Sequence, residues 1–202
     1  MTDAYFWTLH TLTLRQLASV DQLREIVDQS LDDVTAALEK AVTEGTVIAT
    51  RDSYMITPDG REVLDHAYPQ WFSSLRSEQP LVEAFEKFEN GVNKQVLKLT
   101  TEWQTMEVDG EPVVNDHGDP DYDGKIIARL GDVYDKTVKV LDTFAVADPP
   151  VARFLARLGD ALSRAEAGEI AYVSGVRVAS FHTVWFQMHE HLLRVMGRER
   201  PE

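Results

Sequence analysis

Apolar residues recur every three or four positions along most of the chain, which predicts a mainly α-helical protein. Between residues 77 and 106 the spacing alternates between three and four, as in a coiled-coil seam, so we expect one long helix there. Further amphipathic helices are predicted at about 125–145, 151–167 and 180–196. Four such helices in succession indicate a C-terminal helical bundle.

The first third of the chain has shorter elements. Helices are expected at about 4–17, 21–29 and 31–44, and short strands at 47–49 and 54–56. Another helix should follow the second strand. Three helices, a two-stranded wing and a return helix are the order of a winged helix-turn-helix, a fold that usually places its third helix in the DNA major groove.

Local signals mark where these N-terminal elements begin and end. Ser19, Ser30 and Thr57 each precede a predicted helix and carry the hydroxyl of a good N-cap. Pro58 stands at the first helical position, where its missing N–H has no cost. Gly45 follows the third helix as a C′ residue. The boundaries therefore agree with the hydrophobic pattern.

The segment 56–61, Ile-Thr-Pro-Asp-Gly-Arg, is similar to the "LTPxGR" wing exit of MarR-type and PadR-type regulators, and this third of the chain resembles their winged helix. The resemblance implies a winged helix-turn-helix domain over 1–68 and a helical bundle over 69–202. It further implies a cytoplasmic, homodimeric transcriptional regulator that responds to a ligand or partner. Its DNA-facing positions fall, in this sequence, on Ser30, Thr35, Lys40, Arg51 and Arg61.

The charge distribution argues against tight DNA binding. The net charge is −14, and residues 1–66 hold 5 Lys and Arg against 12 Asp and Glu. Phosphate neutralisation supplies most non-specific DNA affinity, so DNA is a disfavoured partner. Asp32 and Asp33, at the start of the third helix, either complement its dipole or mark a module that has lost DNA binding. The alternative function is an acidic winged-helix accessory protein that docks a protein partner and does not bind DNA.

Composition excludes several other classes. There is no cysteine, hence no disulfide, thiol catalysis or Cys-type metal site. No apolar run reaches 18 residues and no basic flank precedes an apolar stretch, so we expect no membrane span, no membrane partner and no signal peptide. Nucleophile elbows, Walker loops and dinucleotide fingerprints are also missing. We therefore expect a protein that is not an enzyme and has no catalytic residues.

Two segments could still carry chemistry. The acidic loop 108–124 matches the first half of an EF-hand, but the twelfth position is Leu130, so no metal and no cofactor is predicted. This loop and the helix 180–196 are also similar to small actinobacterial winged-helix proteins of poorly defined role. Aromatic and histidine side chains could line an apolar pocket between bundle helices, and the candidates are Trp103, Tyr134, His182, Trp185 and His189. Whether His117, His182 and His189 form one site is left open by the sequence.

Overall fold

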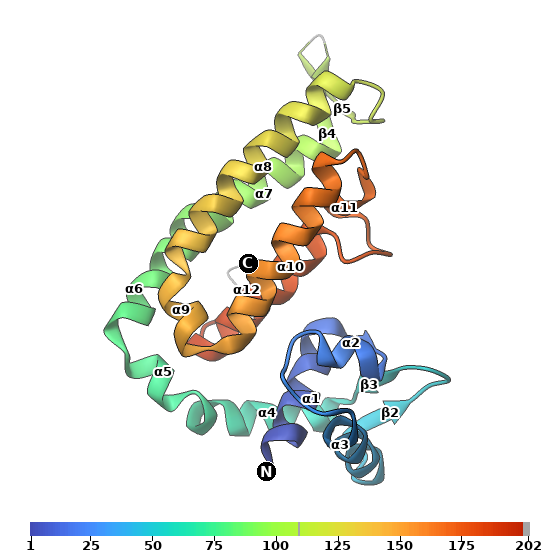
Figure 1. Ribbon diagram of the computed structural model, residues 1–202, viewed down its shortest axis with the longest axis vertical. Helices are drawn as coiled ribbons and strands as arrows, with labels where there is room; N and C mark the ends of the chain where they lie inside the picture. Colours follow the sequence, from blue (N-terminus) through green and yellow to red (C-terminus); the bar gives the residue numbers. More distant parts are fainter. Residues whose placement is uncertain (109, 200–202) are drawn as a thin grey trace. The chain divides into compact units, whose positions relative to one another are not determined.

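The computed structural model describes residues 1–108 and 110–199. The chain is mainly helical, with two small antiparallel sheets (Figure 1). It packs as two compact units. The first comprises Met1–Glu78 and the chain from His189 onward, and the second comprises Gln79–Met188. The sequence predicts a single boundary, between domains 1–68 and 69–202. The compact units instead divide after Glu78, and the chain from His189 onward packs with the first unit. Over the described ranges, no helix is long and apolar enough to cross a membrane.

The first unit alternates helices and short strands. In chain order these are α1 (Asp3–Arg15), β1 (Leu17–Ala18), α2 (Val20–Arg24), α3 (Leu31–Thr43), β2 (Val47–Ala49), β3 (Tyr54–Ile56), α4 (Pro58–Trp71) and α5 (Ser73–Ser77). The strands β2 and β3 have the predicted bounds. The sheet nevertheless has three strands, in the order β1-β3-β2, and not the two that the sequence predicts. Gln16 ends α1 with a φ of 66°, and this turn lets Leu17 pair with Met55 instead of continuing the helix.

The predicted caps of this unit are confirmed. The hydroxyls of Ser19, Ser30 and Thr57 accept hydrogen bonds from backbone N–H groups in the first turns of α2, α3 and α4. Gly45 adopts a φ of 75°, the left-handed conformation that ends α3. The helix α2 is shorter than predicted and ends at Arg24.

Gly60 explains why the 56–61 segment carries a glycine. A Cβ at Gly60 would lie 2.3 Å from the carbonyl oxygen of Thr46 and 2.8 Å from Ile56 Cγ1. The same carbonyl accepts a hydrogen bond of 3.0 Å from the Thr57 N–H. The start of α4 is thus pressed against the chain entering β2, and only a residue without a side chain fits.

The second unit is built from helices and one hairpin. Its elements are α6 (Gln79–Lys87), the π-helix η1 (Phe88–Asn93), α7 (Lys94–Gln104), β4 (Thr105–Val108), β5 (Glu111–Val114), α8 (Pro120–Val140), α9 (Asp142–Ala147), α10 (Pro149–Glu166) and α11 (Ala171–Ser174). The helix α12 (Phe181–Met196) begins in this unit and ends in the first. Within the unit α7 packs on α8, and α8 on α10. The hairpin β4–β5 lies at the far end of α7 and α8 from α9 (Figure 1).

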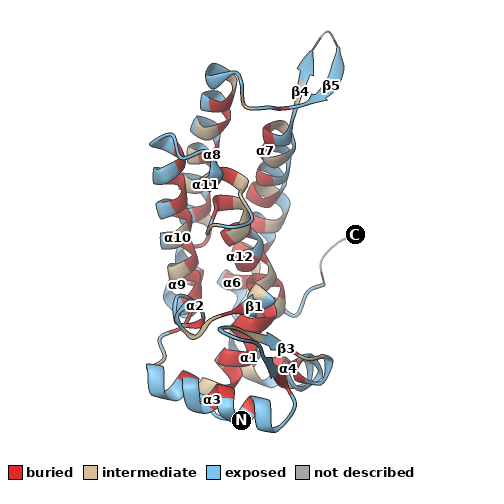
Figure 2. Cartoon of the chain, turned by 90° about the vertical axis from the view of Figure 1, so that its right-hand side faces the viewer, coloured by how far each residue is buried: buried red, intermediate tan, exposed pale blue. Residues whose placement is uncertain are grey.

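Three features of this unit differ from the predicted pattern. The long helix predicted over 77–106 is one helical run from α6 to α7, but a π-helical turn interrupts it around Gly91. The helix predicted over 125–145 begins earlier, at Pro120, and breaks at Leu141. The hairpin β4–β5 stands where the sequence predicts a loop, and its strands are largely exposed, so they lack the burial signal that identifies a strand (Figure 2).

Candidate functional site

The candidate DNA-facing residues of α3 have their polar atoms occupied within the unit. Ser30 Oγ accepts from the Asp33 N–H at 3.1 Å and donates to Asp33 Oδ2 at 2.6 Å. Thr35 Oγ1 donates to the Leu31 carbonyl at 2.8 Å. Lys40 Nζ lies 3.8 Å from Glu44 Oε1 and 4.8 Å from the centre of the Tyr5 ring. The cation on this helix is therefore partly neutralised.

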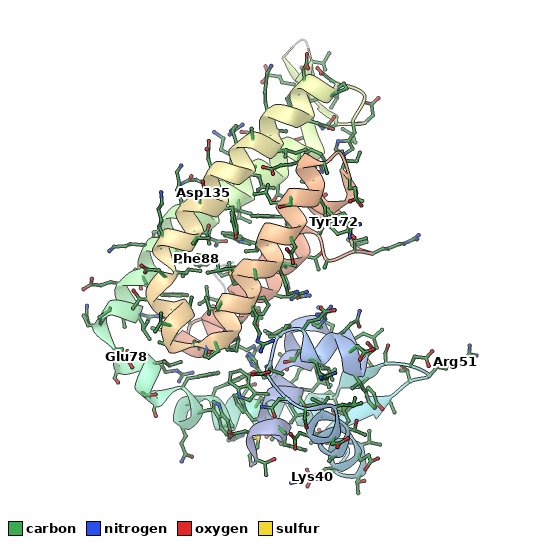
Figure 3. All side chains as sticks on the ribbon, in the orientation of Figure 1. Lys40, Arg51, Glu78, Phe88, Asp135 and Tyr172 are labelled. Carbon is green, nitrogen blue, oxygen red and sulfur yellow. The ribbon has the colours of Figure 1, made fainter. Side chains whose placement is uncertain are left out.

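The two candidate arginines lie on other elements. Arg51 is exposed in the turn between β2 and β3, beside Asp52, and its side chain extends away from the sheet (Figure 3). Two hydrogen bonds of 2.8 Å, from the N–H and hydroxyl of Thr50 to the Ser53 carbonyl, close this turn. Arg61 is exposed in the first turns of α4. The five candidates thus come from three separate segments, α3 with its N-cap, the β2–β3 turn and α4, and all five are exposed. The outer face of α3 is mostly exposed (Figure 2).

The sheet of the first unit carries an apolar row that the sequence analysis missed. Met55 pairs with Leu17 on one side and with Ile48 on the other. Residues directly opposite each other in a sheet point to the same face, and these three are 41 %, 52 % and 49 % exposed. We call Leu17, Met55 and Ile48 the apolar row. The signal was available only once β1 was known to be a strand.

A polar cluster joins the end of α7 to the start of α8 in the second unit. Asp123 is buried, and its Oδ1 accepts from Asn115 Nδ2 at 2.9 Å. Its Oδ2 lies 2.9 Å from His117 Nδ1. Asn115 also donates to the Trp103 carbonyl at 3.1 Å, and its own Oδ1 accepts from the His117 N–H at 3.0 Å. The loop 115–123 is therefore fixed by side-chain hydrogen bonds.

His117 is held in an uncommon conformation by this cluster. Its φ is 61°, a left-handed value that few non-glycine residues adopt and that marks positions worth testing for function. Its ring packs on Trp103 with the ring centres 4.4 Å apart. His117 and Asp123 both line a pocket of about 520 Å³ between the first turns of α8 and the C-terminal end of α10.

The candidate pocket residues do not share one pocket. Trp103 and His182 line a small cavity of about 10 Å³, and burial lowers the pKa of His182. Trp185 is buried, stacks on Phe88 and Phe181, and donates to Asn93 Oδ1 at 3.0 Å. Two further candidates lie elsewhere, since Tyr134 is half-buried against Gly159 and His189 is buried in α12. Trp103 therefore lies between His117 on one side and the His182 cavity on the other.

A second histidine site lies in the interior of the first unit. His10 Nδ1 is 2.9 Å from the Tyr68 hydroxyl, and His10 Nε2 is 2.8 Å from His191 Nδ1. Both histidines are fully buried. Burial, and then the nearby His191 and Arg194, lower the pKa of His10 well below its ordinary value, and burial raises the pKa of Tyr68. Sequence analysis missed this set because its members are 58 and 181 residues apart.

A pocket of about 470 Å³ borders Tyr68, and several of its charged side chains are bonded within the first unit. Arg194 contacts Asp65 at 3.2 Å and Glu190 at 2.9 Å. Arg76 donates to the carbonyls of Val195 and Arg194 at the end of α12, at 2.8 and 2.9 Å. These contacts join α4 and α5 to the C-terminal part of α12.

In residues 1–108 and 110–199, no three His, Asp or Glu side chains gather closely enough to hold an ion. Comparison with known proteins adds no identification. No family model, no curated protein and no solved structure matches this chain.

Proposed function

We propose that the first unit is a winged helix-turn-helix of the MarR and PadR kind, and that it docks a protein partner through the apolar row. The order α1, β1, α2, α3, β2, β3, α4 supports the winged helix. A β-strand after the first helix, paired with the second strand of the wing, fits that order. The helices of the second unit would form the bundle that the sequence predicts.

The observation that carries the docking proposal is the exposure of Leu17, Met55 and Ile48 side by side. Three large apolar side chains in one cross-strand row form a contiguous patch, and such a patch favours a protein interface over a solvated surface. Outside its grooves, DNA has no apolar surface that could cover these three side chains.

Charge indicates what kind of partner would fit. Residues 1–78 hold 6 Lys and Arg against 13 Asp and Glu, a net charge of −7. A second copy would bring the same charge to the interface, whereas a partner with an apolar centre and a rim of Lys and Arg would be attracted. The partner is therefore a basic protein surface.

The second candidate function is a homodimeric DNA-binding regulator. Its DNA-facing residues would be those implied by the resemblance to MarR-type and PadR-type regulators. Arg51 and Arg61, both exposed, favour it. The acidic α3 opposes it, because few phosphates would be neutralised. We expect its affinity for DNA to be undetectable near ~150 mM salt, with a shallow salt slope.

Site-specific cross-linking tests the proposal. A photoreactive amino acid at Met55 in the full chain, irradiated in the native host, is expected to capture one protein at a surface rich in Lys and Arg. Ile48→Ser should abolish the product, and the control Val63→Ser, an exposed apolar site on α4, should leave it intact. Cross-links to DNA or only to a second copy would refute the proposal, as would nanomolar operator binding at ~150 mM salt.

A further inference from the structure

We propose that the pocket beside His117 binds a small amine with an apolar body. This inference concerns the second unit alone and does not depend on the docking function of the first. The argument rests on one free acceptor, the carboxylate of Glu166 in addition to the already bonded Asp123, and a largely apolar lining, which together select for a donor group on a hydrophobic molecule.

The hydrogen bonds of Asp123 decide which nitrogen of His117 is available. A carboxylate only accepts, so the proton between the two side chains belongs to His117 Nδ1. In the neutral ring Nε2 then carries a lone pair. The imidazole ring is held in this orientation, because the Asp123 that binds its Nδ1 is buried and is itself held by Asn115. In the part of the chain that the structure describes, Nε2 has no hydrogen-bond partner.

Besides His117 and Asp123, the pocket has a third polar side chain, Glu166, at the C-terminal end of α10. Its Oε1 approaches α8, since a Cβ at Gly131 would lie 3.7 Å from it. No Lys or Arg is among the described residues that line the pocket. An anionic ligand would therefore be repelled by the Glu166 carboxylate with no cation nearby to offset the repulsion, whereas an ammonium group would be attracted to it.

Apart from Asp123, whose carboxylate is bonded to His117 and Asn115, and two glycines, the rest of the lining is apolar and is held in place. Its apolar members are Pro120, Ile127, Ala128, Ala165 and Ile170. The turn that brings Ile170 to the rim is fixed by two hydrogen bonds from Arg164 to Glu169, of 2.9 and 2.6 Å. Arg164 also stacks over Tyr172, with Cζ 3.7 Å from the ring centre. A preformed rim lowers the cost of binding a small molecule.

The volume of about 520 Å³ suits a molecule larger than a single ring. Ammonium and hydroxyl groups can both donate to Nε2, but only the ammonium also pairs with the Glu166 carboxylate. An amine is thus favoured over an alcohol, and both over a carboxylate.

A matched set of probes tests the proposal on the full chain. Benzylamine, benzyl alcohol and benzoate share one ring and differ in charge, and binding is followed through backbone amide NMR shifts of Gly124, Ile127 and Gly168. We expect saturable shifts with benzylamine at about millimolar concentration for so small a probe. Benzyl alcohol should bind about tenfold more weakly, and benzoate should produce no saturable shift.

Two variants separate the role of Glu166 from a general effect of charge. Glu166→Gln is expected to weaken benzylamine about tenfold, while Asp160→Asn, on the same helix but outside the lining, should leave binding unchanged. Glu166 is exposed, so its replacement should not disturb folding. Absence of saturable binding by benzylamine, binding of benzoate as tight as that of benzylamine, or an unchanged Glu166→Gln variant would each overturn the proposal.

Discussion

His10 in the first unit and His117 in the second both bind a polar side chain through Nδ1, yet their surroundings differ. His10 is fully buried, and its Nε2 contacts a second buried histidine. His117 has a side chain that is 28 % exposed and lines a pocket, and among the described residues its Nε2 has no hydrogen-bond partner. The first ring has no capacity left for a ligand, whereas the second keeps one acceptor. Saturation of both nitrogens therefore separates a structural histidine from a candidate binding residue.

The contrast between the two histidines assumes that the second unit is as firmly packed as the first. Of the variants considered, Trp185→Ala should lose the most stability, about 3–5 kcal/mol in unfolding free energy, because it leaves a cavity beside Phe88 and Phe181. Urea denaturation measures the loss. The control Trp185→Phe keeps the stacking and removes the hydrogen bond to Asn93, so it should lose only about 1 kcal/mol. Equal losses for the two variants would mean that the ring is not packed as described.

His10→Ala should destabilise the first unit by about 2–4 kcal/mol, since it removes two buried hydrogen bonds and a ring stacked on Phe6. Hydrogen exchange of α1 peptides, read by mass spectrometry, reports on this unit separately. His66→Ala, at an exposed site on α4, is the control and should stay within about 0.5 kcal/mol. A His10→Ala variant as stable as the control would contradict a structural role for the contacts of His10 with Tyr68 and His191.

The lowered pKa of His10 predicts how stability depends on pH. The unfolded chain takes up a proton near pH 6.5, whereas the folded chain does so only at lower pH. Stability is thus fully present above about pH 6.5 and falls below it, by up to about 1.4 kcal/mol per pH unit from this group. The groups facing His10 are Tyr68, His191 and Arg194, and none of them supplies a negative charge in the folded state.

Urea midpoints of the wild type and of His10→Gln at pH 7.5, 6.5 and 5.5 measure this slope. Because other groups titrate in both proteins, the difference between the two curves is the relevant quantity. The variant should lose less stability than the wild type as the pH falls. Parallel curves would show that His10 is protonated equally in the folded and unfolded chains.

The smallest effect is expected for His117→Ala, at most about 1 kcal/mol in unfolding free energy. Its ring is partly exposed, and Asp123 keeps its hydrogen bond from Asn115 after the change. The same urea experiment measures it. A loss as large as that of His10→Ala would place His117 among the structural residues and erase the contrast between the two sites.

Sequence predicted the elements whose signals are local. The strands 47–49 and 54–56 and the caps Ser19, Ser30 and Thr57 depend on neighbours within a few residues, and all are found. The strand β1 was missed because its partner, Met55, is distant in the chain. The hairpin β4–β5 was missed because both of its strands are exposed.

The same contrast between local signals and contacts of distant residues applies to the candidate sites. The sequence singled out His117 and the acids around it, since they are close in the chain, but assigned them no common function. Its five pocket candidates lie in different surroundings, since Trp103 and His182 line one small cavity and Trp185 stacks on Phe88 and Phe181. The contact of His10 with His191 joins helices at opposite parts of the chain, and no periodicity can reveal such a pair.

The first unit is discontinuous, and this has a consequence for how the protein folds during synthesis. A ribosome adds roughly 5–20 residues per second, and domains usually fold as they emerge. Here α1 is made early, but its partner His191 lies 181 residues later, beyond the whole second unit. His10 must therefore remain partly uncovered for roughly 10–40 s at that rate. The second unit can close first, and the order of completion reverses the order of translation.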